Sequence, residues 1–158
     1  MKVFISHKKE DTAIANEIAI KLLSSRLDCY LNVIDIHLKE SGQNFAGYIR
    51  SQLEKCTQLI AVIGAKTHTS WWVPWEIGLA TEKERFLASF VADAVPVPEY
   101  LLKWPYLRSM DDIDEYIEVS KASQLIVENG YRTGREQISR SLAFKNFHTD
   151  LKARLFQK

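Results

Sequence analysis

The sequence has no long hydrophobic run and few cysteines, and both absences narrow the class of protein. No apolar stretch in its 158 residues approaches the roughly 20 needed to cross a bilayer, so we expect neither a membrane span nor a membrane partner. Cys29 and Cys56 have neither CxxC nor metal-ligand spacing, which predicts two buried, reduced thiols and no metal site. Apolar residues make up 46% and charged residues 26%, the balance of a globular domain.

Several motifs of common α/β enzymes are also missing. There is no GxGxxG after the first apolar run and no GxxxxGK[ST], which excludes a dinucleotide fingerprint and a P-loop. A phosphoacceptor receiver needs acidic residues at positions that here read HKK (residues 7–9) and GAK (residues 64–66). A serine or cysteine hydrolase would need GxSxG and a catalytic triad, and neither is evident.

The amino terminus lacks the layout of a signal peptide. Met1 and Lys2 lead directly into a strand-like apolar run at residues 3–5. We therefore expect a cytoplasmic protein.

The net charge of +1 hides an uneven distribution. Residues 131–158 carry seven Lys and Arg against Glu136 and Asp150, a net +5 that leaves −4 for residues 1–130. Such a segment either meets an acidic partner or forms the solvated face of a helix. It lacks the interleaved aromatics of RNA-binding segments, so we do not expect nucleic acid as a partner.

Short apolar runs alternate with longer segments of helical periodicity. The runs predict strands at residues 3–5, 29–34, 59–63 and 106–108, and a short edge strand within residues 91–97, where two prolines stand. Apolar positions recurring at threes and fours predict helices over roughly residues 14–22, 45–56, 74–87, 113–130 and 138–155, with caps at Asp11 or Thr12 and at Asp111 or Asp112.

This alternation predicts a doubly wound, flavodoxin-like α/β domain. Its five-stranded, mainly parallel sheet should have the order 2-1-3-4-5, with helices on both faces. Residues 1–130 would form this domain, and residues 131–158 a basic amphipathic helix packed on it or extending it.

The carboxyl edge of that sheet is the expected binding place, because ligands of doubly wound sheets bind where the strand order reverses. Residues 6–10 and 64–76 would meet there between the first and third strands, with residues 35–44 alongside. The carboxylate available is Glu76, beside the tryptophans of residues 71–75. It is either a complement to the helix dipole beside a tryptophan core, or a desolvated functional group.

Three segments resemble the Toll/interleukin-1 receptor (TIR) family. Residues 3–9, VFISHKK, resemble its first box, an apolar strand ending in F-I-S-Y/H. Residues 35–44 occupy the place of the loop after the second strand, with Gly42 where a glycine is usual. Residues 70–76, SWWVPWE, match the pattern S-x-W-x-x-x-E, with Val73 where many members carry cysteine.

The resemblance, to bacterial stand-alone members that cleave NAD, implies an NAD+ glycohydrolase or cyclase with Glu76 as the catalytic carboxylate. Such enzymes break the nicotinamide–ribose bond and release nicotinamide with ADP-ribose or a cyclic isomer, as a bacterial immune signal or to deplete NAD. NAD+ is then the substrate, and no cofactor is expected. The substrate pocket would be lined by Phe4, Ser6, His7, Lys8, Asp35, Leu38, Lys39, Gly42, Ser70 and Trp72.

Two other functions stay open. A non-catalytic TIR module would act through homotypic assembly, using residues 35–44 and the last helix. A nucleoside deoxyribosyltransferase-like enzyme would also set a carboxylate against a ribosyl centre. The resemblance further implies a homo-oligomer on activation, in which the loop after the second strand of one subunit completes the pocket of the next, and a downstream effector protein that senses the nucleotide.

Overall fold

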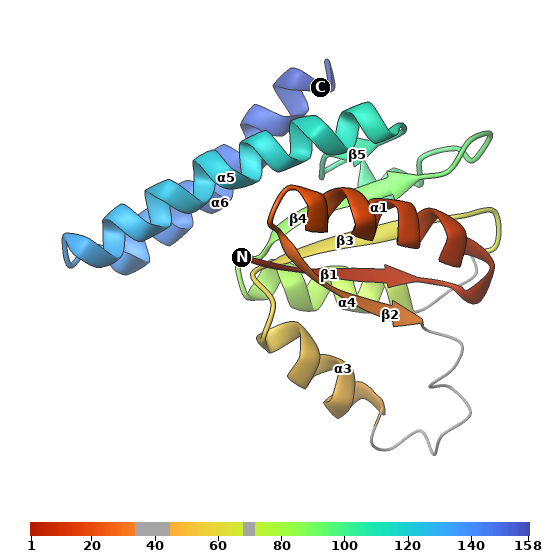
Figure 1. The fold of residues 1–158 in the computed structure, drawn as a ribbon, viewed down its shortest axis with the longest axis horizontal. Coiled ribbons are helices and arrows are strands. Elements are labelled where there is room, and N and C mark those ends of the chain that lie inside the picture. The colour runs from red at the N-terminus through yellow and green to blue at the C-terminus, as the bar shows by residue number, and fades with distance from the viewer. Residues whose placement is uncertain (34–44, 68–71) are drawn as a thin grey trace.

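A parallel sheet of five strands forms the centre of the protein, seen here in a computed structural model that describes residues 1–33, 45–67 and 72–158 (Figure 1). The strand order is β2-β1-β3-β4-β5, which confirms the predicted doubly wound topology. Every pair of neighbouring strands runs parallel. The strands are β1 Lys2–His7, β2 Asp28–Val33, β3 Gln58–Ile63, β4 Phe86–Val91 and β5 Tyr106–Leu107.

Helices cover both faces of the sheet and form two hydrophobic clusters. One cluster joins β1 side chains such as Ile5 to α1, α5 and α6, and the other joins Phe4 to α3 and α4. β3 and β4 are buried at every position because both of their faces are covered. The helices are α1 Thr12–Ser24, α3 Phe45–Glu54, α4 Trp72–Glu82, α5 Met110–Arg132 and α6 Glu136–Arg154, with short 3-10 turns η1 Lys9–Asp11 and η3 Glu99–Leu101.

The prediction for residues 74–97 was wrong in two respects, and the first is that the fourth strand is β4, not a segment within residues 91–97. Helix α4 ends at Glu82 instead of continuing to residue 87. Glu84 adopts a left-handed conformation (φ 50°), and the Arg85 N–H donates to the Ala80 carbonyl at 2.9 Å, which closes the helix without a glycine. The apolar run of β4 fits a buried helix or a buried strand equally well, and only pairing with β3 decides.

The start of α5 also differs from the prediction. Ser109, not Asp111 or Asp112, is the capping residue: its hydroxyl accepts from the Asp112 N–H, and the Asp112 carboxylate accepts from the Ser109 N–H, each at 3.2 Å. This capping box satisfies N–H groups that have no partner inside the helix. At the start of α1, Asp11 occupies the cap position without a side-chain capping bond.

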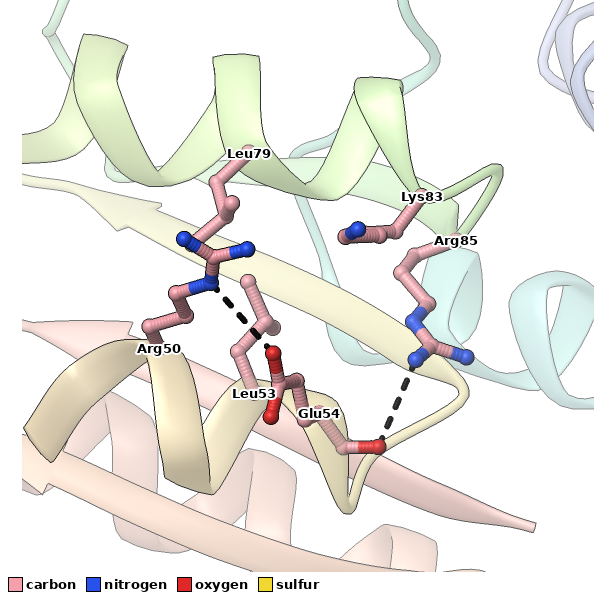
Figure 2. A pocket seen from close by; sticks show the side chains of 6 residues that line it. All are labelled: Arg50, Leu53, Glu54, Leu79, Lys83 and Arg85. Atoms are coloured by element: carbon pink, nitrogen blue, oxygen red, sulfur yellow. Dashed lines mark hydrogen bonds and ion pairs between the residues drawn. The ribbon is translucent and has the colours of Figure 1, made fainter. Parts of the chain in front are cut away.

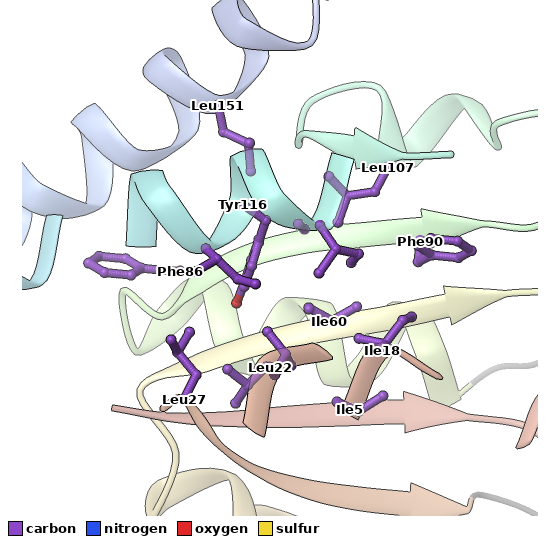
Figure 3. Packing of buried hydrophobic residues seen from close by; sticks show 14 of the residues in the cluster. Ile5, Ile18, Leu22, Leu27, Ile60, Phe86, Phe90, Leu107, Tyr116 and Leu151 are labelled. Carbon is purple, nitrogen blue, oxygen red and sulfur yellow. The ribbon is translucent and has the colours of Figure 1, made fainter. Parts of the chain in front are cut away.

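Helices α5 and α6 form a long antiparallel pair that extends past the amino ends of the strands (Figure 1). Helix α5 continues through Gly130, where α6 approaches so closely that a β-carbon would collide with Ser139. The α6 residue Phe147 stacks on Phe86 of β4 at 4.8 Å between ring centroids, and Figure 3 shows Leu151 of α6 and Tyr116 of α5 in the same cluster. Helix α6 is therefore packed on the domain, and α5 is continuous across the predicted division at residue 130.

Both cysteines are free thiols, and they belong to different core clusters. Cys56 is buried as predicted, whereas Cys29 is only partly buried. Burial raises the pKa of both thiols, so neither is activated as a nucleophile. None of the helices within the described ranges is long and apolar enough to cross a membrane.

His148 of α6 is a buried core residue for which the sequence offered no partner. Its Nδ1 lies 2.7 Å from the Phe144 carbonyl oxygen and so donates to it, while Nε2 accepts from the Leu87 N–H at 3.2 Å. Both nitrogens of a neutral ring are thus satisfied. Burial, the largest cause, lowers the pKa of His148 to about 4.

Acid should destabilise the fold through His148. Since its folded-state pKa of about 4 lies below the ordinary 6.5, the unfolded chain binds a proton between these pH values that the folded protein excludes. The contribution of neutral His148 to the free energy of unfolding is complete above pH 6.5 and should fall by about 3 kcal/mol towards pH 4. We expect His148→Gln, which keeps an acceptor but cannot titrate there, to lose less stability than wild type in urea unfolding across this window. Parallel stability curves for the two proteins would contradict this assignment.

Candidate active site around Glu76

Glu76 lies one turn into α4 and points into the protein. The helix begins at Trp72, so Pro74 falls in the first turn, where its missing N–H is not needed. The next turn brings Glu76 against the carboxyl ends of the first two strands, where it is only 1% exposed. A carboxylate so deeply buried requires partners for its oxygens.

Two polar side chains from neighbouring strands hold the carboxyl group of Glu76. The Ser6 hydroxyl of β1 donates to Oε2, and the Asn32 amide of β2 donates to Oε1 at 3.2 Å. Ser6 and Asn32 are register partners in the parallel ladder, so their side chains leave the sheet side by side on one face. The carboxyl group therefore spans the ends of β1 and β2.

The environment of Glu76 raises its pKa to about 7. Burial is the largest cause, because it disfavours the charged form, and the hydrogen bonds from Ser6 and Asn32 only partly offset it. The ion pairs among the described residues do not include Glu76. A carboxyl group that titrates near neutral pH without a cationic partner is typical of a functional site.

The position of Glu76 differs from the expected one. The crevice was expected between the ends of β1 and β3, whereas the partners of Glu76 come from β1 and β2. Asn32 was not predicted as a site residue. Its signal in the sequence was a single amide inside the apolar run of residues 29–34, which becomes informative only when the register places it beside Ser6.

The crevice between β1 and β3 holds a second buried carboxylate, Asp11. The Thr67 hydroxyl accepts from the Gly64 N–H at 2.9 Å and donates to Asp11 Oδ2 at 3.3 Å. A β-carbon on Gly64 would collide with the Asp11 carboxylate, so a larger residue here would displace the Asp11 side chain. Burial raises the pKa of Asp11, and the Thr67 hydrogen bond opposes that shift. The sequence suggested only a capping role for Asp11.

The described substrate-pocket candidates fall into two groups. Phe4 and Ser6 lie on the face of the sheet that Glu76 contacts, and the Phe4 ring packs against Tyr30 at 5.5 Å between centroids. His7 is 1% exposed and, by the alternation of a strand, points to the opposite face. His7 and the partly exposed Lys8 lie nearer Asp11, and both oppose the rise in the pKa of that carboxyl group.

The remaining candidates, Asp35, Leu38, Lys39, Gly42 and Ser70, lie outside the described residues, as does the side chain of Trp72. Their predicted roles in substrate binding stay predictions. Trp75 is described and is 37% exposed, so it lies at the surface of α4. Within the described ranges, no group of three or more His, Cys, Asp and Glu side chains is placed to hold a metal ion.

Comparison with known families agrees with the fold. Residues 3–126 match the family model of the TIR domain, a span that runs from β1 into α5. The chain belongs to the TIR domain family. Members of this family cleave NAD or act as signalling adaptors, and TIR domains commonly self-associate. No curated protein matches the chain. Helix α6 lies outside the part that matches the TIR family model.

Replacing Glu76 should stabilise the protein above neutral pH. Because its folded-state pKa of about 7 exceeds the ordinary 4.5, the folded protein retains a proton that the unfolded chain loses between these values, and stability falls as pH rises. Gln carries no charge, and it can accept from Asn32 through its oxygen and donate to the Ser6 hydroxyl oxygen through its amide nitrogen. Glu76→Gln should therefore exceed wild type by up to about 3 kcal/mol above pH 7. Urea unfolding at pH 5 and pH 8 measures the difference.

The exposed Glu17 supplies the control, since Glu17→Gln removes the same charge from the surface of α1. It should leave stability nearly unchanged at both pH values. A Glu76→Gln protein less stable than wild type at pH 8 would show that the carboxylate is a structural anion.

Proposed function

We propose that this TIR domain is an NAD+ glycohydrolase or cyclase that breaks the nicotinamide–ribose bond, with Glu76 as the catalytic residue. The observation that carries the proposal is the buried Glu76 carboxyl group. It is held at both oxygens, titrates near pH 7 and lies at the carboxyl edge of the sheet. NAD+ is the substrate, and the chemistry needs no cofactor.

The charge of the substrate suits this carboxylate. The nicotinamide ring of NAD+ is a cationic pyridinium, so it leaves as a neutral base without a general acid. As the bond breaks, positive charge develops on the ribose near C1′, and a carboxylate in a site that excludes water stabilises it. A single acid is then sufficient, and Glu76, held at the ends of β1 and β2, can supply it.

Ser6 and Asn32 act as positioning residues in this mechanism. Their hydrogen bonds fix the plane of the carboxyl group and favour its charged form. Water attack at C1′ then gives ADP-ribose and releases a proton. Attack by a ring nitrogen of the bound adenine gives a cyclic isomer. Either product would serve as an immune signal for a nucleotide-sensing effector protein, and turnover itself would deplete NAD.

NAD+ can reach Glu76 only if the residues that cover it move, because the Glu76 side chain is 1% exposed. We propose that homo-oligomer formation supplies this change, since TIR domains commonly self-associate. In such an assembly residues 35–44 of one subunit would complete the pocket of its neighbour. The chain would act in the cytoplasm, where NAD is available.

A non-catalytic TIR interaction module is the second candidate. The observation that favours it is the same burial: a carboxyl group satisfied at both oxygens and covered from solvent also fits a structural role. The family match supports these two functions, and it gives no support to a deoxyribosyltransferase.

Glu76→Gln should reduce NAD cleavage more than tenfold with the fold intact. The loss corresponds to at least about 1.4 kcal/mol of transition-state stabilisation, because Gln keeps the shape and removes the charge. Nicotinamide release by concentrated or crowded protein is the measurement, with mass spectrometry of the nucleotide products. Glu17→Gln, the surface control, should retain full activity.

A wild-type protein that releases no nicotinamide even when assembled would favour the interaction module. Equal cleavage by wild type and Glu76→Gln would remove Glu76 from the mechanism while leaving the enzyme assignment in place. Release of free base from deoxynucleosides, with NAD left uncleaved, would support a nucleoside deoxyribosyltransferase-like enzyme.

The pH dependence of cleavage should report the ionisation of Glu76. Since the carboxylate is the active form and the pKa of the free protein is about 7, kcat/KM should rise with pH and level off above that value. Ser6→Ala removes a hydrogen bond that lowers the pKa, so its profile should shift to higher pH. A profile flat between pH 6 and 8 would show that another group limits the reaction.

A further inference from the structure

A cleft bordered by charged side chains lies between α3 and α4, at the amino ends of β3 and β4 (Figure 2). Because α4 runs from the carboxyl edge of the sheet to the amino edge, this cleft and Glu76 lie at opposite ends of the helix. We call it the α3–α4 cleft. It is lined by Arg50, Leu53, Glu54, Leu79, Lys83 and Arg85.

Three cations and one carboxylate surround an apolar floor. Leu53 is 2% exposed and belongs to the core cluster beneath α3 and α4. Arg50, Lys83 and Arg85 come from α3, from the turn after α4 and from the residue before β4, so the cleft carries a net +2 after Glu54 is counted. Charges brought together from three separate segments are a feature of the fold rather than of one helix surface.

Arg85 is the least satisfied of these cations. Its Nε is buried without a hydrogen-bond partner, and Nη2 donates to the main-chain carbonyl of Glu54 at 3.3 Å. Among the described residues it forms no ion pair with a carboxylate. Burial is the largest cause that lowers the pKa of Arg85, and repulsion from Arg140 adds to it. A half-buried guanidinium without an anion is costly.

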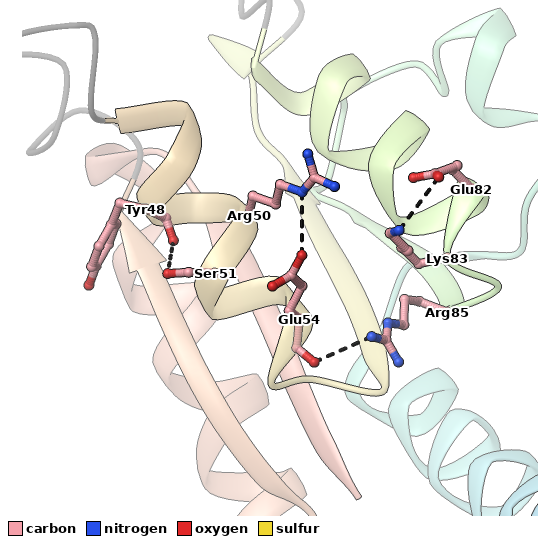
Figure 4. A network of polar contacts seen from close by, with 7 residues as sticks. All are labelled: Tyr48, Arg50, Ser51, Glu54, Glu82, Lys83 and Arg85. Atoms are coloured by element: carbon pink, nitrogen blue, oxygen red, sulfur yellow. Dashed lines mark hydrogen bonds and ion pairs between the residues drawn. The ribbon is translucent and has the colours of Figure 1, made fainter.

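Within the described parts of the chain, Arg50 and Lys83 form only exposed, weak ion pairs. Arg50 Nε lies 3.3 Å from Glu54 Oε1 within α3, and Lys83 Nζ lies 3.5 Å from Glu82 Oε1 of the adjacent residue. Such pairs contribute little to stability and are easily exchanged. Figures 2 and 4 show the Lys83 side chain between Arg50 and Arg85, with the Arg50 guanidinium projecting toward α4.

We propose that the α3–α4 cleft binds the phosphate group of a small phosphorylated molecule. A tetrahedral phosphate offers acceptor oxygens in several directions, which matches donors arriving from three segments. Two phosphate oxygens would accept hydrogen bonds from Nε and one Nη of Arg85 in a bidentate arrangement. The remaining phosphate oxygens would accept from Arg50 and Lys83. This satisfies the buried Nε of Arg85 and balances the +2 charge of the cleft.

The surroundings favour a small soluble phosphate over a lipid surface. Glu82 and Glu84 flank Lys83, and Glu54 faces the cleft, so an anionic bilayer would meet carboxylates around the cations. A single phosphate group needs only the cleft, which is closed by its own side chains, so the partly exposed Arg50 and Lys83 side chains must move apart to admit it. Glu54 stays paired with Arg50 through Nε, which leaves the Nη groups of that guanidinium for the ligand.

Thermal unfolding and calorimetric titration with inorganic phosphate and with pyrophosphate test the proposal. Ionic strength is held constant with sodium chloride. Ligand that binds the folded protein should raise the Tm by about 3 °C or more at saturation. Lys83→Gln should weaken binding at least tenfold, and Arg50→Gln with Lys83→Gln should abolish it. Both side chains are at least partly exposed, so the variants should fold.

Lys121→Gln is the matched control, because it removes one positive charge from an exposed position on α5 far along the sequence from the cleft. It should bind phosphate as wild type does, and so should Glu76→Gln, since the cleft does not include Glu76. If Glu76→Gln still binds phosphate, then phosphate binding at the α3–α4 cleft does not depend on NAD cleavage.

Three results would overturn the proposal. They are no saturable binding of either ligand by wild type, an equal loss of binding in Lys121→Gln and Lys83→Gln, and binding that Glu76→Gln abolishes. Co-sedimentation with anionic phospholipid vesicles tests the lipid source. Vesicle binding that free phosphate does not compete, together with no titration signal, would overturn the small-molecule assignment.

Discussion

The candidate site depends on the parallel register of β1 and β2. Ser6 and Asn32 can hold the two oxygens of Glu76 only because they are direct partners in the ladder and share a face of the sheet. A slip of one residue would turn either side chain to the opposite face and leave a buried carboxyl group without a donor. The apolar clusters on both faces of the sheet oppose such a slip, because it would move their side chains to the wrong face and disrupt the packing of both clusters. Packing far from Glu76 therefore maintains its hydrogen bonds.

Helix α4 connects the two polar regions of the protein. Near its amino end it carries the buried Glu76, and just past its carboxyl end Lys83 and Arg85 face the α3–α4 cleft. This distribution of charge suits the helix dipole, which favours anions at the start and cations at the end. Burial has opposite consequences at the two ends. Burial raises the pKa of Glu76 to about 7, so its carboxyl group is easily neutralised. The half-buried Arg85 remains charged and needs an anion.

The last helix completes the domain on the side of β5. That strand has only two residues, and the Gln157 side chain accepts from the N–H of Tyr106 at 3.1 Å and donates to its carbonyl. Covering a short edge strand in this way prevents pairing with another chain. An ion pair between Arg154 and Glu115 at 2.7 Å links α6 to α5. Part of the net positive charge of residues 131–158 is thus used within the fold, although the TIR family match ends at residue 126.

The sequence by itself determined the alternation of strands and helices and the strand order, and it singled out Glu76 as the candidate catalytic residue, because hydrophobic periodicity and three short boxes are local signals. It misplaced β4, since an apolar run such as residues 86–91 is compatible with a helix until β3 pairs with it. It also missed Asn32, the Asp11–Thr67 contact and the buried Nε of Arg85. Each of these joins residues distant in the chain, and the pKa of Glu76 follows from the desolvation that such packing creates. Tertiary structure alone decides them, because burial and register are properties of the folded chain.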